Sequence, residues 1–71
     1  MEPALIRDYP IEGISHLEIF PPLAFGGQIH YPLFIDGQTY ITGKIEGSWI
    51  AEELPEQVCS YVGNLIEYYK L

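Results

Sequence analysis

Cysteine is nearly absent from this 71-residue chain, in which Cys59 is the only residue of that type. An internal disulfide is therefore excluded, and a lone thiol is typical of a reducing, intracellular setting. The start of the chain lacks the basic region and apolar stretch of a signal peptide, and no apolar run approaches the ~18 residues of a spanning helix. We therefore expect a cytoplasmic protein with no membrane segment.

Basic residues are also scarce, with three lysines and arginines against ten aspartates and glutamates, which gives a formal net charge of −7. A negative surface repels phosphate backbones and anionic lipids, so direct binding to nucleic acid or to a membrane is disfavoured. The charge has two interpretations. It keeps a small domain soluble, or its carboxylates imitate phosphates, as in an antitoxin or a phage-encoded defence inhibitor that occupies the nucleic-acid site of a basic protein.

The residues of common catalytic and metal sites do not occur in the required groups. A nucleophilic site would need Cys59 beside His16 or His30, yet a reactive thiol needs electropositive surroundings that three basic residues can hardly provide. The two histidines are fourteen positions apart, whereas metal ligands usually come in close pairs. Gly26-Gly27 is not followed by the Gly-Lys-Ser/Thr of a phosphate-binding loop. We predict a protein that is not an enzyme and has no cofactor or metal.

Apolar residues, by contrast, are plentiful, at 48% of the chain with ten tyrosines, phenylalanines and tryptophans. This composition predicts a folded chain, and its length predicts one small domain. Alternating apolar residues predict a strand over 14–20, which Pro21-Pro22 ends. The segment 23–27 is expected to be an apolar loop, and 4–9 is expected to be extended.

The clearest signal is a pair of β-prone runs, 29–35 and 38–46, on either side of Asp36-Gly37. Asp-Gly favours the positive φ angles of a tight turn, so the sequence predicts a β-hairpin. Its register has two alternatives. A two-residue turn pairs Ile35 with Gln38, whereas a three-residue turn with a bulge at Gly37 shifts the pairing by one residue.

The segment 54–70 predicts a helix, because its apolar residues recur at spacings of three and four on one stripe. They are Leu54, Val58, Tyr61, Val62, Leu65 and Tyr69. Gly63 is unfavourable inside a helix by about 1 kcal/mol relative to alanine, which indicates close approach of a strand or of a second copy. Residues 48–51 suggest an earlier helical turn. Together these elements predict an α+β fold, in which an antiparallel sheet of three or four strands carries the C-terminal helix on one face.

Two apolar surfaces exceed what the core of so small a monomer needs. The first lies in the predicted loop after Pro21-Pro22, and the second lies on the helix, where tyrosines widen the apolar surface. Each has an alternative interpretation as core. The candidate partner-binding residues are Phe20, Leu23, Phe25, Tyr61, Ile66, Tyr68 and Tyr69.

We therefore predict a non-catalytic interaction or regulatory protein that acts by binding a protein partner, with a homodimer as one form. The phosphate-imitating inhibitor is a more specific version of this function, and a small accessory subunit with a structural role is the alternative from another class. Besides the two apolar surfaces, an exposed sheet edge is a third candidate binding site, at which a partner would add its own strand to the sheet. A basic partner should bind more weakly at higher salt, whereas apolar contacts should depend little on salt.

Overall fold

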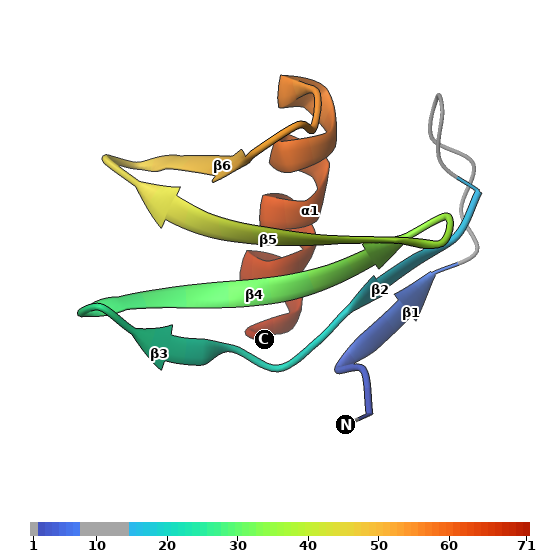
Figure 1. Ribbon diagram of the computed structural model, residues 1–71, viewed down its shortest axis with the longest axis horizontal. Coiled ribbons are helices and arrows are strands. Elements are labelled where there is room, and N and C mark those ends of the chain that lie inside the picture. Colours follow the sequence, from blue (N-terminus) through green and yellow to red (C-terminus); the bar gives the residue numbers. More distant parts are fainter. Residues whose placement is uncertain (1, 8–14) are drawn as a thin grey trace.

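The computed structural model describes residues 2–7 and 15–71, which form one antiparallel sheet and one C-terminal helix (Figure 1). The α+β class is confirmed, but the six strands exceed the three or four predicted. The sheet order is β1-β2-β4-β5-β6, with β3 paired to β4. The elements are β1 Leu5–Arg7, β2 Leu17–Ile19, β3 Leu23–Phe25, β4 Gln28–Ile35, β5 Gln38–Ile45, β6 Ser48–Ala51 and α1 Glu56–Tyr69.

Three two-residue turns build most of the sheet. They are Gly26-Gly27, Asp36-Gly37 and Glu46-Gly47, which follow one another at intervals of ten residues. Both residues of each turn have a positive φ, between 45° and 86°. Positive φ at both positions gives a turn whose twist matches that of the flanking strands. The middle turn pairs Ile35 with Gln38, so the two-residue alternative is the one observed.

The loop predicted over 23–27 and the helical turn predicted over 48–51 are both wrong. The first segment contains β3, which pairs with β4, and the second is β6, which pairs with β5. Each segment adjoins a tight turn: Gly26-Gly27 follows β3, and Glu46-Gly47 precedes β6. A Gly-Gly or Glu-Gly pair that adopts positive φ reverses the chain and aligns the next residues for strand pairing.

The Pro21-Pro22 sequence interrupts the sheet without ending it. Ile19 pairs with Leu33 and Leu23 pairs with His30, so three residues on the outer strand oppose two on β4. This extra residue is a β-bulge, and it turns the side chains of β3 to the opposite face from the one that simple alternation along β2 would give.

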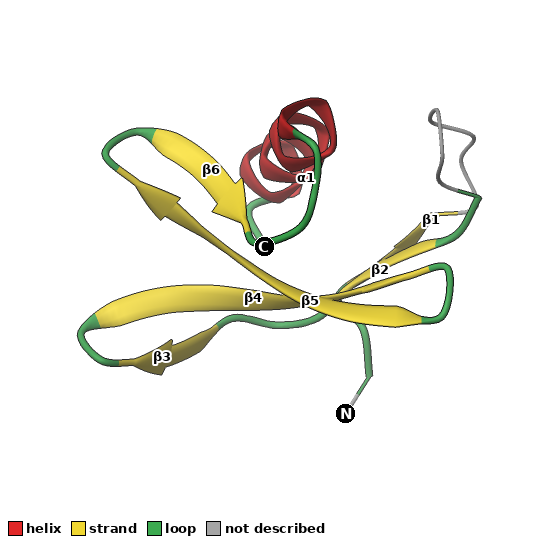
Figure 2. Cartoon of the chain, turned by 45° about the horizontal axis from the view of Figure 1, so that its top comes forward, coloured by secondary structure: helices red, strands yellow, loops and turns green. Residues whose placement is uncertain are grey.

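Helix α1 covers one face of the sheet, as Figure 2 shows from a view turned by 45°. The helix begins where the Pro55 carbonyl oxygen accepts bonds from the amides of Val58 and Cys59, and it ends where Lys70 adopts a left-handed conformation. The buried core lies between helix and sheet and consists of Leu17, Ile19, Leu33, Ile35, Val58, Val62 and Ile66. Of the predicted stripe, Val58 and Val62 are buried, whereas Tyr69 is exposed.

Gly63 lies against Trp49 of β6. A Cβ atom at position 63 would be 2.2 Å from Cδ1 of the indole, which is shorter than any contact that two carbons tolerate. The close approach of a strand, which the sequence predicted at this glycine, is therefore observed. The absence of a side chain at Gly63 lets the indole approach the helix closely.

Candidate interaction surfaces

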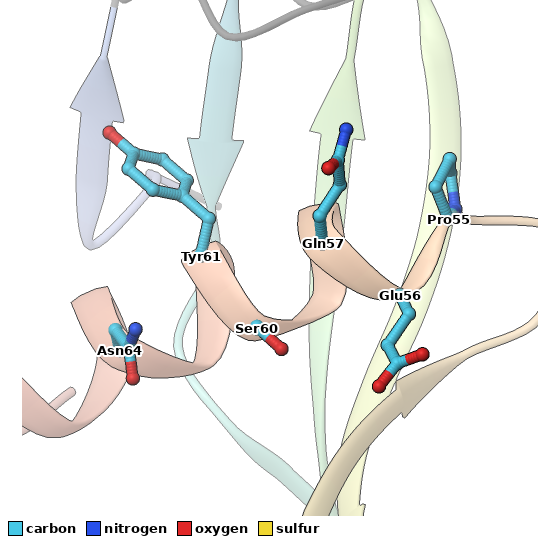
Figure 3. A pocket seen from close by; sticks show the side chains of 6 residues that line it. All are labelled: Pro55, Glu56, Gln57, Ser60, Tyr61 and Asn64. Carbon is cyan, nitrogen blue, oxygen red and sulfur yellow. The ribbon is translucent and has the colours of Figure 1, made fainter.

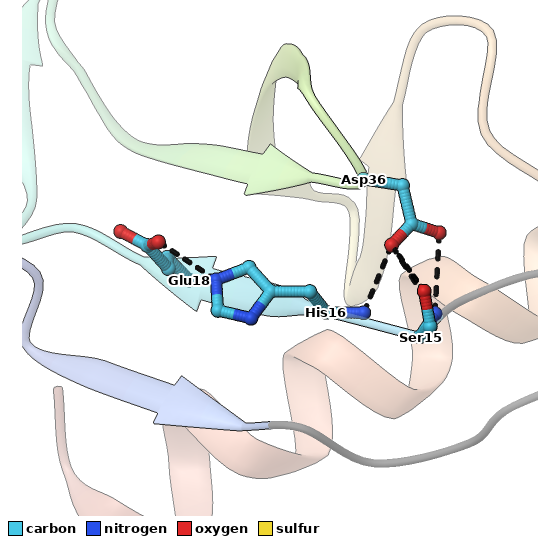
Figure 4. A network of polar contacts seen from close by, with 4 residues as sticks. All are labelled: Ser15, His16, Glu18 and Asp36. Carbon is cyan, nitrogen blue, oxygen red and sulfur yellow. Dashed lines mark hydrogen bonds and ion pairs between the residues drawn. The ribbon is translucent and has the colours of Figure 1, made fainter.

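A polar network joins the β4–β5 turn to the start of β2 (Figure 4). The carboxylate of Asp36 accepts hydrogen bonds from the Ser15 hydroxyl at 2.8 Å and from the backbone amides of Ser15 and His16. The Nε2 atom of His16 lies 2.7 Å from a carboxylate oxygen of Glu18. In a catalytic triad the hydroxyl would bond to the imidazole, but here it donates directly to the carboxylate. The network therefore fastens the turn to the neighbouring strand.

Replacing Asp36 with asparagine is expected to make stability less sensitive to acid. Hydrogen bonds from the Ser15 hydroxyl and then from the backbone lower the pKa of Asp36. Its stabilising effect is thus complete above about pH 4, where the unfolded chain has lost this proton, and it disappears as the pH falls through the lowered pKa of the folded chain. Asparagine also suits the turn but does not titrate in this range.

Urea unfolding at a series of pH values from about 6 to about 3 measures this effect. The Asp36→Asn variant should lose less free energy of unfolding over that range than the wild type. A decline as steep as that of the wild type would show that Asp36 does not contribute to acid sensitivity.

The chain's one cysteine lies inside the molecule. Cys59 is buried, and its Sγ atom lies 3.9 Å from the carbonyl oxygens of Ala51 and Leu54. Within the described ranges, no three histidine, cysteine, aspartate or glutamate side chains lie close enough together to hold a metal ion.

A shallow depression of about 710 Å³ runs along the outer side of α1 (Figure 3). Its lining comes from the helix and from the proline just before it: Pro55, Glu56, Gln57, Ser60, Tyr61 and Asn64. In Figure 3, the side chains of Gln57 and Tyr61 point to one side of the helix, whereas those of Glu56, Ser60 and Asn64 point away from them. Because the polar groups diverge, the depression does not present a set of groups to one small ligand.

A second cluster surrounds Trp49 on the side of the sheet that carries α1. The indole Nε1 atom donates to Glu67 at 2.7 Å, and Lys44 Nζ lies 3.1 Å from the same carboxylate oxygen. The bond from Trp49 and then the contact with Lys44 lower the pKa of Glu67. The ring of Tyr31 meets the indole edge-on at 5.8 Å. This cluster fastens β6 to the helix and uses one of the chain's three basic residues.

The partner-binding residues predicted on the helix do not form one surface. Ile66 is 3% exposed and lies in the core, and Tyr61 is half-buried against it. Tyr68 is 78% exposed. The hydroxyl of Tyr69 accepts a hydrogen bond from Arg7 of β1, whose guanidinium carbon lies 5.2 Å from the centre of the tyrosine ring. At the helix end, therefore, Tyr68 and part of Tyr69 remain available for contact.

The partner-binding residues predicted in the loop belong to the sheet. The amide of Phe20 donates to the Pro32 carbonyl oxygen at 2.9 Å, which places Phe20 opposite Pro32, and its side chain is half-buried. Leu23 is 43% exposed. The backbone of Phe25 pairs with Gln28, while its side chain is outside the described part of the structure. Phe20 and Leu23 lie on the face of the sheet opposite α1, since their partners on β4 alternate with the buried Leu33.

We call this surface the helix-free face. It comprises the strand residues that alternate with those facing α1. Five aliphatic side chains on it are between 43% and 55% exposed: Ile6, Leu23, Ile41, Ile45 and Ile50. Half-buried Phe34 and Pro32 lie among them on β4. In Figure 1 the reader looks onto this face, with α1 behind β4 and β5.

Ile6, Ile41, Ile45 and Ile50 were not among the predicted partner-binding residues, although β5 carried a signal. Its residues facing α1 are Gln38, Tyr40, Thr42 and Lys44, whereas its residues facing away include Ile41 and Ile45. A sheet with one side in water usually turns its apolar residues toward the core and its polar residues outward, and β5 departs from this pattern.

Charge is scarce on the helix-free face. The strand register places Glu18 and His30 on it, while Arg7 and Lys44 are on the side of α1. A hollow of about 250 Å³ opens beside Gly43, and its lining includes His30, Ile41, Ile45, Ile50 and the exposed Glu52. Gly43 itself is buried, and a Cβ atom at this position would lie 3.4 Å from Nδ1 of His30.

No family model, curated protein or solved structure matches this chain. Among the described residues, no helix is both long and apolar enough to span a membrane, and α1 has 14 residues. A proposal about function therefore starts from the surface of the molecule itself.

Proposed function

We propose that this chain is a non-catalytic interaction protein, and that the helix-free face is the surface through which it binds another protein chain. One observation carries the proposal. Five aliphatic side chains, each close to half exposed, share a sheet face that no helix covers, and three of them, Ile41, Ile45 and Ile50, line one hollow. Exposed apolar surface of this kind marks contact sites between proteins.

The energetic case is that each of these side chains gains from being covered. Full burial of an isoleucine or leucine stabilises by about 1.5–3 kcal/mol, so completing the burial of one that is half exposed contributes roughly half of that. The face has few charges whose desolvation would oppose binding: Glu18 and His30 are the ionisable residues of its described strands, and Glu52 lines its hollow. Its mainly apolar surface suits the core of a protein interface.

Affinity purification from the native host tests the proposal with two matched variants. Ile41→Glu places a carboxylate on the helix-free face, and Ile29→Glu places one on the other face at a residue that is 58% exposed, against 50% for Ile41. A partner should be retained by the wild type and Ile29→Glu and lost from Ile41→Glu. Retention of the same partner by Ile41→Glu would overturn the proposal.

The phosphate-imitating inhibitor stays a second candidate because several carboxylates are exposed outside this face. Glu46, Glu52, Glu53 and Glu56 are exposed, and none forms an ion pair with another described residue. An inhibitor of this kind would displace nucleic acid from a basic target and would bind more weakly as the salt concentration rises. Binding through the helix-free face, including that of an accessory subunit, should change little with salt.

A further inference from the structure

We infer that the occupant of the helix-free face is a second copy of this chain, and that two copies pack sheet against sheet with both helices on the outside. This inference rests on the proposed function, because it names the partner for the same surface. The dimer would be symmetric about a two-fold axis and would present the same residues from each copy.

The width of the face suits a second copy. Its exposed apolar side chains span the sheet from Ile6 on β1 to Ile50 on β6. A partner that covers all of them must be about as wide as this sheet, and a second copy of the chain presents such a surface.

The distribution of charge also favours a second copy. Two chains of net charge −7 repel each other wherever their carboxylates meet. On the helix-free face the described strands contribute one carboxylate, Glu18, which is already bonded to His16. Glu52 also lines the hollow of this face. The other strand positions of the face are uncharged apart from His30, so two copies that meet there bring few of their described carboxylates together.

The shape of the face is self-complementary about one particular axis. A two-fold axis along β4 through Pro32 exchanges β5 with the outer strand formed by β2 and β3. It sets Leu23 of one copy over Gly43 of the other, because both lie in the row Leu23–His30–Gly43–Ile50. Leu23 then lies over the hollow beside Gly43, and this occurs twice.

The alternative two-fold axis runs across the strands. It would place Thr39 over Gly43, since the two residues are equally far along β5 from Ile41. Thr39 is smaller than leucine and polar, so it would cover less of the hollow and of the isoleucines around it. The axis along β4 is also the one that brings Phe20 over Ile41, which are both opposite Pro32. Aligned sheets of this kind pack face to face about 10 Å apart.

The size of the chain gives a further reason for assembly. A domain of about 70 residues is marginally stable, and small proteins usually add disulfides, a metal or oligomerisation. A single cysteine excludes an internal disulfide, so a second copy is a direct way to complete the burial of this sheet.

Sedimentation equilibrium of the full chain tests the inference. The wild type should have a mass of about 16 kDa, twice the 8.1 kDa of one chain, and this mass should change little with salt. Ile41→Glu should raise the dissociation constant at least about a hundredfold, because it buries an unpaired carboxylate. Ile29→Glu, which adds the same charge on the other face, should leave the dimer intact. Circular dichroism verifies folding, and Ile50→Glu on edge strand β6 replaces Ile41→Glu if that variant does not fold.

The remaining outcomes separate the inference from the proposal on which it rests. A wild type that stays at 8.1 kDa at high concentration, or an Ile29→Glu variant that dissociates, overturns the dimer. If the wild type is monomeric while Ile41→Glu still abolishes capture of a partner, the proposed function survives with a different occupant. Leu23→Ala should weaken the dimer about tenfold or more, and an unchanged dissociation constant would overturn the pairing of Leu23 with Gly43.

Discussion

Replacing Gly63 with alanine should lower the free energy of unfolding by about 2 kcal/mol, although alanine is the better helix former. The added Cβ would lie 2.2 Å from Cδ1 of Trp49 and 2.3 Å from Cγ. Overpacking of this kind costs up to about 3 kcal/mol or more, and the gain in helix propensity offsets about 1 kcal/mol of it. The indole cannot move away freely, because its Nε1 atom is bonded to Glu67 at 2.7 Å.

Urea unfolding with a matched control measures this effect. Asn64→Ala makes a change to alanine at the next residue of the helix, where the side chain is exposed, and its stability should stay close to that of the wild type. In the double variant Gly63→Ala/Trp49→Ala, the cost of the Gly63 change should largely disappear, since the clashing ring is gone. If Gly63→Ala were as stable as Asn64→Ala, the close approach of Trp49 would be contradicted.

Replacing Leu33 with alanine should destabilise the chain by about 3 kcal/mol, within the usual range of about 2–5 kcal/mol for such truncations. Leu33 is 1% exposed and lies on the central strand β4, where it packs with Ile19 in the core under α1. Alanine leaves a cavity that rigid strand neighbours on both sides can close only in part. Because small domains are marginally stable, this loss is a large share of the total.

The control for Leu33→Ala is Gln38→Ala on the adjacent strand. Gln38 is exposed and lies outside the helix-free face, so its truncation should change the free energy of unfolding by no more than about 0.5 kcal/mol. Both variants are compared by urea unfolding at one protein concentration, so that any effect of assembly is the same. Equal stability of the two variants would contradict the assignment of Leu33 to the core.

The elements predicted most successfully from sequence were those with strong local signals. Asp36-Gly37 identified its hairpin because the turn needs positive φ at both positions, and Gly63 identified a close contact because glycine is unfavourable inside a helix. The same local signal was present at Gly26-Gly27 and at Glu46-Gly47. The ten-residue interval between the three turns would have predicted β3 and β6.

Other features depended on tertiary structure and could not be predicted locally. The helix has apolar residues on more than one side, so periodicity alone could not decide that Ile66 faces the core while Tyr68 faces solvent. The bulge at Pro21-Pro22 reverses the faces of β3, and only the pairing with β4 reveals it. The residues of the helix-free face can be grouped only when the pairing of each strand with its neighbours is known.

Solvent accessibility of the isoleucine methyl groups tests the central claim, that the helix-free face is a contact surface covered by a second copy. In one isolated chain, Ile29, Ile41 and Ile50 are 58%, 50% and 50% exposed, so a dissolved paramagnetic agent would broaden their methyl signals to similar extents. The assembled protein should instead show strong broadening of Ile29 and protection of Ile41 and Ile50. Equal broadening of all three at a high protein concentration would contradict it.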